Sequence, residues 1–136
     1  MKKLGLLTSV LFVILTIFSG CGKEQLQLTR VTYQALQKDG NYGEESIISD
    51  QKTLEKLASI ADEIKWEKTF PSMAKEGDVK AVLYYDEKKN MPERMYEYEI
   101  WFNENGKAEF LSHEEKSYGK LNKNKSETLK KLLFNK

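Results

Sequence analysis

The chain has 136 residues, of which 40% are hydrophobic and 32% charged, and its formal net charge is +1. This length predicts one domain, and the balanced charge argues against wholesale disorder and against a dedicated nucleic-acid-binding protein. A single cysteine excludes an intramolecular disulfide and any zinc or redox site built on paired cysteines. A single histidine excludes a histidine-rich metal cage and leaves little material for nucleophile–base catalysis. We therefore expect no enzymatic activity, no metal and no cofactor.

The N-terminal segment has the pattern of a targeting signal. Lys2 and Lys3 precede an apolar run of 15 residues, 4–18. As a helix this run would be about 22 Å long, at 1.5 Å per residue. Crossing a bilayer takes roughly 20 apolar residues. Length and flanking charges therefore favour a cleaved secretory signal over a permanent membrane span.

The lone cysteine closes this segment. Phe18-Ser19-Gly20-Cys21 resembles the lipobox of bacterial lipoproteins. The resemblance implies a diacylglyceryl group on Cys21 and cleavage just before it; the alternative is an uncleaved anchor helix with a structural cysteine. We expect a signal peptide over 1–20, a lipidated tether over 21–25 and a single domain over 26–136. The protein would then sit on the exterior face of a Gram-positive cell membrane, held there by Cys21.

The remaining chain alternates between strand and helix patterns. The predicted strands are Gln25–Ala35 with a bulge near Arg30, Ser46–Ile48, Val79–Tyr85, Met95–Phe102, Lys107–His113 and Ser117–Leu121. Helical spacing of leucines predicts a helix over Gln51–Lys65, capped by Ser49 or Asp50, and a C-terminal helix capped by Ser126. Residues 66–77 are predicted to form a connection that covers the core. Val79–Tyr85 is nearly all apolar, which favours a central strand buried on both faces.

These elements predict an α+β fold. We expect an antiparallel sheet of about four to six strands, with one long helix packed on a face and a short C-terminal helix.

Asn103-Glu104-Asn105-Gly106 predicts a tight hairpin with a defined register. Asn at the first position and Gly at the fourth suit a type I turn followed by a left-handed residue. The three-residue loop pairs residues whose numbers sum to 210, so that Ile100 faces Phe110 and Trp101 faces Glu109.

This register gathers candidate site residues on the outer face of the hairpin. They are Glu97, Glu99, Glu109 and His113, with Trp101 beside them. A carboxylate and an imidazole within reach of each other could bind a metal or shuttle a proton. A solvated face with one cross-strand charge pair is the alternative. A compact cleft holding Glu97 and His113 would favour the enzyme or metal hypothesis, whereas a flat apolar patch around Trp101 would favour binding.

The aromatic residues divide between the two faces. The alternation of side chains along the strand places Tyr96 and Tyr98 on the core face, which favours packing in the core over a stacking platform for sugars or peptides. Parity directs Trp101 outward among glutamates. It is then either a binding anchor or covered by the C-terminal helix.

Charge is distributed unevenly along the chain. The last 21 residues carry seven Lys and one Glu, whereas residues 21–115 have a net charge of −7. The lysines that could contact anionic lipid or a wall polymer are Lys120, Lys123, Lys125, Lys130 and Lys131. A solvated lysine-rich helix is the alternative.

The whole chain resembles the small YhfM-type lipoproteins of Gram-positive bacilli. The residues behind this resemblance are the lipobox, Ile47-Ile48-Ser49-Asp50, Asp78, and Tyr98–Phe102 before Asn105-Gly106. It implies an anchored exterior domain and supplies no catalytic residue. We expect a monomeric, non-enzymatic module that binds an envelope protein, peptide or wall polymer and no nucleic acid. The alternatives are an inhibitor or immunity lipoprotein against a secreted toxin or lytic enzyme, and an envelope enzyme or metal-binding protein using Glu97 and His113.

Overall fold

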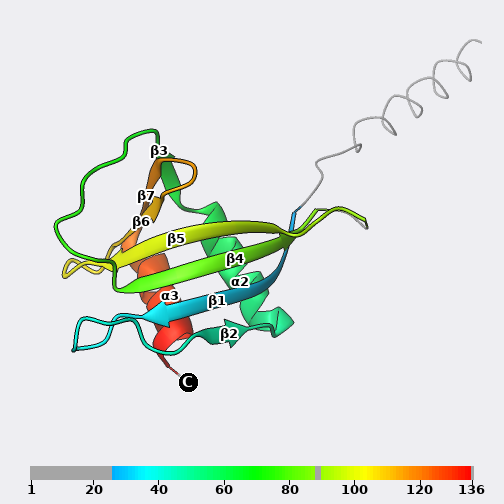
Figure 1. Ribbon diagram of the computed structural model, residues 1–136, viewed down its shortest axis with the longest axis horizontal. Helices are drawn as coiled ribbons and strands as arrows, with labels where there is room; N and C mark the ends of the chain where they lie inside the picture. The colour runs from blue at the N-terminus through cyan, green and yellow to red at the C-terminus, as the bar shows by residue number, and fades with distance from the viewer. Residues whose placement is uncertain (1–25, 88–89, 136) are drawn as a thin grey trace, which may run out of the picture.

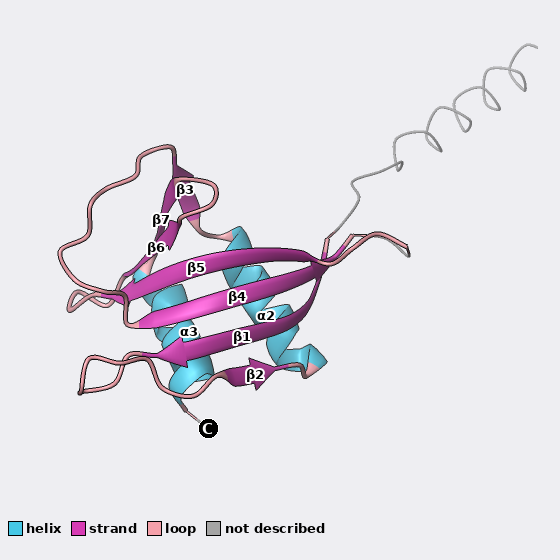
Figure 2. Ribbon diagram, in the orientation of Figure 1, coloured by secondary structure: helices cyan, strands magenta, loops and turns pink. Residues whose placement is uncertain are grey.

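One antiparallel sheet organises the molecule. The structure, a computed structural model, describes residues 26–87 and 90–135. The described elements are β1 (Gln27–Ala35), β2 (Ser46–Ile48), α2 (Gln51–Asp62), β3 (Lys65–Glu67), β4 (Val79–Asp86), β5 (Arg94–Phe102), β6 (Ala108–Ser112), β7 (Ser117–Leu121) and α3 (Lys123–Phe134). The strand order is β2-β1-β4-β5-β6-β7-β3, and every neighbouring pair is antiparallel. Both helices cover one face of this sheet (Figure 1), which we call the inner face, and leave the outer face to loops (Figure 2).

The predicted fold was wrong in its strand count and in its helices. The described sheet has seven strands rather than four to six, and α2 and α3 each have 12 residues instead of one being long and the other short. The unpredicted strand is β3, in a segment where the sequence indicated only a helix end and a connection. All three residues of β3 are exposed, so it lacks the alternation that identifies a strand. Pairing with β7, distant in sequence, is what orders it.

The predicted helix boundaries also need correction. Asp50 caps α2 as predicted, because its carboxylate accepts a hydrogen bond from the Thr53 N–H at 3.0 Å. The helix ends at Asp62 rather than at Lys65, because Lys65 begins β3. The N-cap of α3 is Asn122, whereas Ser126 lies inside the helix and is buried.

The predicted hairpin register is confirmed. Ile100 pairs with Phe110 and Trp101 with Glu109, and the residue numbers of every pair from Glu99–Leu111 to Phe102–Ala108 sum to 210. The predicted bulge is also confirmed by a register shift before Arg30. β4 is central in the sheet as predicted, but its outer face is not buried, since Lys80 is exposed.

The core lies between the inner face and the helices. α2 contributes Leu54, Leu57 and Ile60, and α3 contributes Leu129 and Leu133. They pack against inner-face side chains that include Val31, Val79, Ala81, Ile100 and Phe110. Burying each such leucine or isoleucine stabilises the fold by about 1.5–3 kcal/mol. Because the helices occupy the inner face, most of the polar side chains of the sheet are left to the outer face.

Candidate functional site

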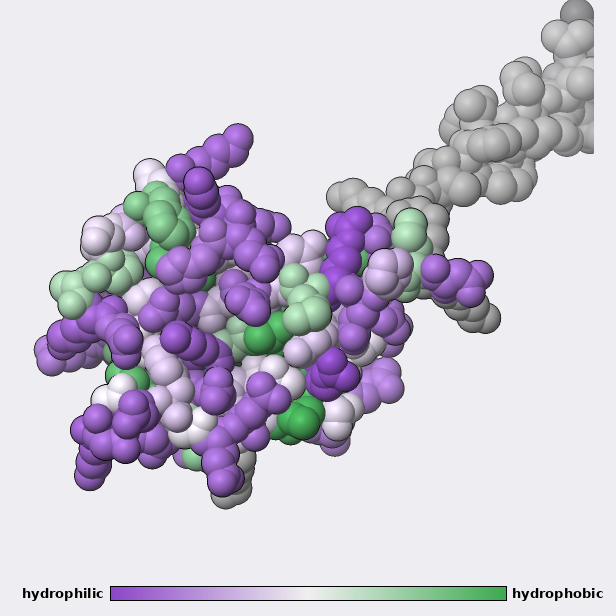
Figure 3. Space-filling view, viewed as in Figure 1, coloured by the Kyte–Doolittle hydropathy of each residue, from purple (hydrophilic) through white to green (hydrophobic). Residues whose placement is uncertain are grey.

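The connection between β3 and β4, residues 68–78, crosses part of the outer face, and we call it the strap. In Figure 1 it leaves the sheet edge at β3 and returns to the start of β4. Its Met73 packs against Trp101, Leu111 and Tyr118, which form a small second apolar cluster. The visible outer face is otherwise largely hydrophilic (Figure 3). The strap therefore covers this apolar cluster on an otherwise largely polar face of the sheet.

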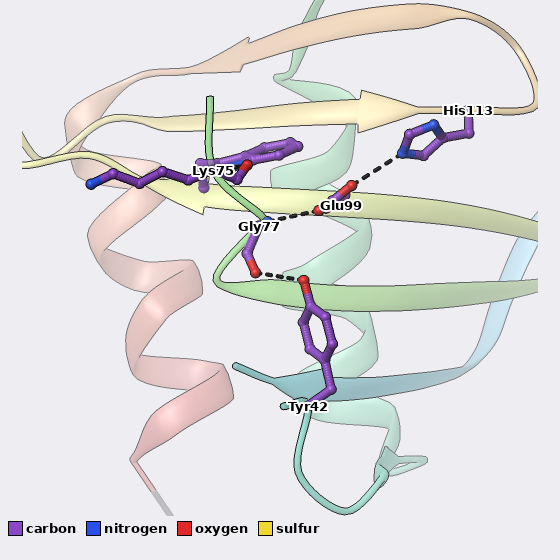
Figure 4. A network of polar contacts seen from close by, with 6 residues as sticks. Tyr42, Lys75, Gly77, Glu99 and His113 are labelled. Carbon is purple, nitrogen blue, oxygen red and sulfur yellow. Dashed lines mark hydrogen bonds and ion pairs between the residues drawn. The ribbon is translucent and has the colours of Figure 1, made fainter. Parts of the chain in front are cut away.

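Hydrogen bonds at Lys75, Gly77 and Asp78 fasten the end of the strap, and Figure 4 shows the two at Gly77. The Asp78 carboxylate accepts from the Phe102 N–H at 2.7 Å, and the Asp78 carbonyl accepts from the Leu36 N–H at 2.8 Å. The Trp101 indole N–H donates to the Lys75 carbonyl at 3.0 Å. The Gly77 N–H donates to Glu99 Oε1 at 2.7 Å. The Tyr42 hydroxyl, from the β1–β2 loop, donates to the Gly77 carbonyl at 2.8 Å. The strap is thus held mainly by polar contacts and by Met73, not by the core.

A groove of about 870 Å³ lies between the strap and the sheet. Outer-face residues of β1, β4 and β5 line one side, and strap residues 70–76 line the other. Its carboxylates, lysines and histidine are Glu45, Lys75, Glu76, Lys80, Glu97, Glu99 and His113. Acidic groups outnumber basic ones, so the groove favours a ligand with positive charge or hydrogen-bond donors.

The structure brings together three of the predicted site residues. Glu97, Glu99 and His113 all line the groove. Glu109 lies on the same face but points elsewhere: it accepts hydrogen bonds from the Tyr118 hydroxyl and, at 2.9 Å, from the Asn103 amide. Glu109 therefore serves the β5–β7 structure and not the groove.

Trp101 is not the exposed anchor that parity suggested. Its side chain is 8% exposed and lies under the strap. The alternative, cover by the C-terminal helix, is also wrong, because α3 lies on the other face (Figure 1). The alternation of side chains along a strand correctly gives the face on which Trp101 lies, but it cannot reveal which loop covers that face.

His113 and Glu99 form the chemically distinctive pair of the groove. His113 Nε2 lies 3.1 Å from Glu99 Oε2, and the two side chains are 62% and 14% exposed. The imidazole edge also meets the Phe70 ring, with centroids 5.6 Å apart. Such a pair can relay a proton or anchor a cationic group. Within residues 26–87 and 90–135, no group of three or more His, Cys, Asp or Glu is placed to hold a metal ion.

Tyr42 is a site residue that sequence reasoning missed. Burial and the nearby carboxylates of Glu99, Glu76 and Asp78 raise the pKa of Tyr42 to about 12. Its hydroxyl is therefore protonated at neutral pH and can donate to the strap. No local pattern links the β1–β2 loop to the strap, so no signal in the sequence could have identified this contact.

The predicted lysine surface is only partly free. Lys120 lies 3.6 Å from Glu67, and Lys125 lies 3.4 Å from Glu63. Lys123, Lys130 and Lys131 belong to α3 and form no ion pair with another described residue. Whether this surface meets a membrane or polymer stays a prediction.

The predicted signal peptide, tether and Cys21 lie outside the described residues. Over residues 26–87 and 90–135, no helix has the length and apolar character needed to cross a bilayer.

No protein-family model and no curated protein sequence matches this chain. One solved structure is similar in fold: a thioesterase-like protein from Clostridium sporogenes ATCC 15579. The two share 18% sequence identity with a TM-score of 0.59 over 85% of this chain and 100% of that chain. At this identity the similarity establishes a common fold alone.

Proposed function

We propose that this protein is a lipid-anchored binding module on the exterior face of the cell membrane, with its ligand site in the groove between the strap and the sheet. The groove is the observation that carries the binding role. Its volume of about 870 Å³ falls within the usual range of roughly 300–1,000 Å³ for ligand sites. One wall is a segment held mainly by hydrogen bonds at Lys75, Gly77 and Asp78, which a ligand can displace more easily than a packed core.

We infer a peptide segment with a lysine or arginine as the ligand. Glu97 is exposed and forms no hydrogen bond or ion pair with a described residue. It can therefore pair with an incoming cation without breaking an existing contact. Phe70, 47% exposed at the groove, offers an apolar surface for a neighbouring side chain.

The groove is tested by site-specific photo-crosslinking in intact cells. A photoreactive amino acid in place of Ser72, which is exposed and lines the groove from the strap, should capture a partner that the same group at Glu127, exposed on α3, does not capture. With the probe at position 72, Glu97→Lys should abolish this capture, and Glu127→Lys should leave it unchanged. Equal capture at positions 72 and 127, or none at position 72, contradicts the proposal. A secreted toxin or lytic enzyme as the partner would favour the inhibitor or immunity role, and a glycan would identify a wall-polymer ligand.

Anchoring rests on the lipobox sequence and has its own test. Cys21→Ala should remove incorporation of labelled palmitate and shift the protein out of the lipidated membrane fraction, whereas Gly22→Ala should do neither. Labelling that survives in the Cys21→Ala variant would rule out lipidation at this residue. Two acyl chains are expected because a single chain gives only marginal membrane binding.

An envelope hydrolase is a second candidate. The groove holds Glu97, Glu99 and His113 together, and the fold neighbour is itself described as thioesterase-like. His113 could take a proton from a water that attacks an acyl thioester, while the thiolate departs. This candidate predicts thioester hydrolysis that His113→Ala abolishes and Glu109→Gln retains. Absence of turnover across a panel of acyl thioesters would eliminate it.

A further inference from the structure

A second pocket, of about 610 Å³, lies on the inner face between the helices and the sheet, and we call it the core pocket. Its lining is apolar apart from Asp62 and the hydroxyls of Tyr85, Tyr96 and Tyr98. Protein interiors are normally packed to near crystal density. An open space of this size beside the core therefore has room for a ligand.

Two phenols offer unused hydrogen-bonding groups to this space. The hydroxyls of Tyr85 and Tyr98 form no hydrogen bond with a described residue, although both side chains are half-buried. No fully buried polar side-chain atom of the described chain lacks a partner, so these two hydroxyls are not fully buried, and both tyrosines line the pocket. Burial raises the pKa of Tyr85 to about 12 and that of Tyr98 further. Both are therefore protonated and able to donate at neutral pH.

The charge at the pocket selects against an anion. The Asp62 carboxylate lines the pocket and contributes to the raised pKa of Tyr85. A free fatty acid would place its carboxylate near this charge, whereas a neutral ester would present only a carbonyl acceptor. The lining thus matches an apolar chain that ends in a neutral, hydrogen-bond-accepting group.

The N-terminal end of the described chain lines the core pocket. Leu26, 36% exposed, lines the pocket and is the first described residue. Cys21 lies five positions earlier in the sequence, a distance of at most about 18 Å when extended. Trp66, 40% exposed, also lines the pocket, with its ring 5.5 Å from that of Tyr98. An acyl chain entering from the membrane would meet apolar side chains at once.

We propose that the core pocket binds the acyl chain of a neutral membrane lipid ester, with the ester carbonyl accepting hydrogen bonds from Tyr85 and Tyr98. The membrane as the source of the lipid rests on the proposed anchoring, whereas binding in the pocket does not.

The two tryptophans provide the test, because they lie on opposite faces of the sheet. The sample is the chain from residue 22 onward, which contains every described element and all core residues. The probe is 1-(9,10-dibromostearoyl)glycerol, whose bromines quench tryptophan only at short range. Saturable quenching is expected in Trp101→Phe, which retains Trp66, and not in Trp66→Phe, which retains Trp101. Quenching that does not saturate, or that is equal in the two variants, overturns the proposal.

The polar contacts have a matched control on the same strand. Tyr85→Phe combined with Tyr98→Phe should weaken probe binding about tenfold, since each removes one hydrogen bond. Tyr84→Phe, on the opposite face beside Arg30, should leave it unchanged. At pH 8, 9,10-dibromostearic acid should bind at least about tenfold more weakly than its glycerol ester. Equal affinity of acid and ester, or of Tyr85→Phe/Tyr98→Phe and the wild type, contradicts the assignment.

Because this probe is added in solution, the result is independent of lipidation. A Cys21→Ala variant that remains palmitoylated would overturn the anchoring and leave the pocket assay intact. Failure of the quenching assay would overturn the pocket and leave the anchoring intact.

Discussion

Trp66 of β3 pairs with Gly119 of β7 in the antiparallel ladder between these two strands. A Cβ on Gly119 would stand 2.5 Å from Ile64 Cγ2 and 2.9 Å from the Trp66 ring. Favourable carbon contacts begin at about 3.5 Å, so a side chain there would push both residues away. The missing side chain lets β3 close the sheet edge and brings Trp66 to the rim of the core pocket.

Gly119→Ala is therefore expected to destabilise the domain by about 1–3 kcal/mol. Urea unfolding followed by circular dichroism measures this change. Combined with Trp66→Ala, the loss should be less than the sum of the two single losses, because removing the indole relieves part of the clash. Strict additivity would show that the clash with Trp66 is not the cause.

At the scale of elements, the strap and the helices are held by different forces. α2 and α3 bury leucines against the sheet, whereas the strap relies on Met73 and on hydrogen bonds at Lys75, Gly77 and Asp78. A segment with few buried apolar contacts opens at a lower free-energy cost than a well-packed one. The strap is thus the part of the domain expected to open first, and it is also a wall of the groove.

Glu99→Ala should release the strap. It leaves the buried Gly77 N–H without an acceptor, at a cost of about 1–3 kcal/mol. Hydrogen exchange should accelerate over residues 68–78, as measured by mass spectrometry. Glu97→Ala, on the same strand and face but exposed, is the control and should change stability by about 0.5 kcal/mol or less. Similar exchange rates in the two variants would contradict this account.

The two helix caps predict opposite responses to acid. Hydrogen bonds from Thr53 hold the pKa of Asp50 below its usual value. The unfolded chain then binds more protons than the folded one, so this stabilisation is present above the unfolded pKa of about 3.9 and is lost as pH falls through the folded pKa. Asp50→Asn keeps the cap and should reduce the loss of stability between pH 7 and pH 2.5.

The N-cap of α3 gives the converse experiment. Asn122 accepts from the Lys125 N–H at 2.9 Å and does not titrate. Asn122→Asp should therefore increase the sensitivity to acid over the same range. Urea midpoints at the two pH values measure both changes, and identical acid sensitivity in all three proteins would exclude a role for the caps.

At the scale of the whole molecule, one sheet separates two different environments. The outer face carries an acidic groove, and the inner face carries an apolar pocket with tyrosine hydroxyls. The lysines of α3 form a third surface, and ion pairs with Glu63 and Glu67 occupy two members of the predicted lysine set. The free lysines should then dominate any contact with an anionic surface.

The chain from residue 22 onward should bind vesicles that contain anionic lipid, and salt should weaken this binding. Replacing Lys123, Lys130 and Lys131 together by alanine should reduce it by about 1 kcal/mol per lysine. Replacing the paired Lys120 and Lys125 should have a smaller effect per residue. Co-sedimentation measures the binding; absent or salt-insensitive binding removes the membrane-contact hypothesis.

The sequence predicted some features because they depend on neighbouring residues. The hairpin register follows from Asn103 and Gly106 with two-residue alternation, and the α2 cap follows from Asp50 before a leucine stripe. The third strand was missed because its three residues are exposed and owe their order to β7. The cover over Trp101 was missed because no local rule places a loop on a distant strand.

The candidate sites divide in the same way. The sequence by itself determined which side chains share the outer face, and its lipobox pattern defined Cys21 as the candidate lipidation site. Only the tertiary structure decided that Glu99 joins His113 to the strap, that Tyr42 reaches Gly77, and that an apolar pocket opens on the inner face. The physical reason is that alternation along a strand is a local property, whereas a groove or a pocket exists only where segments far apart in the chain pack against each other.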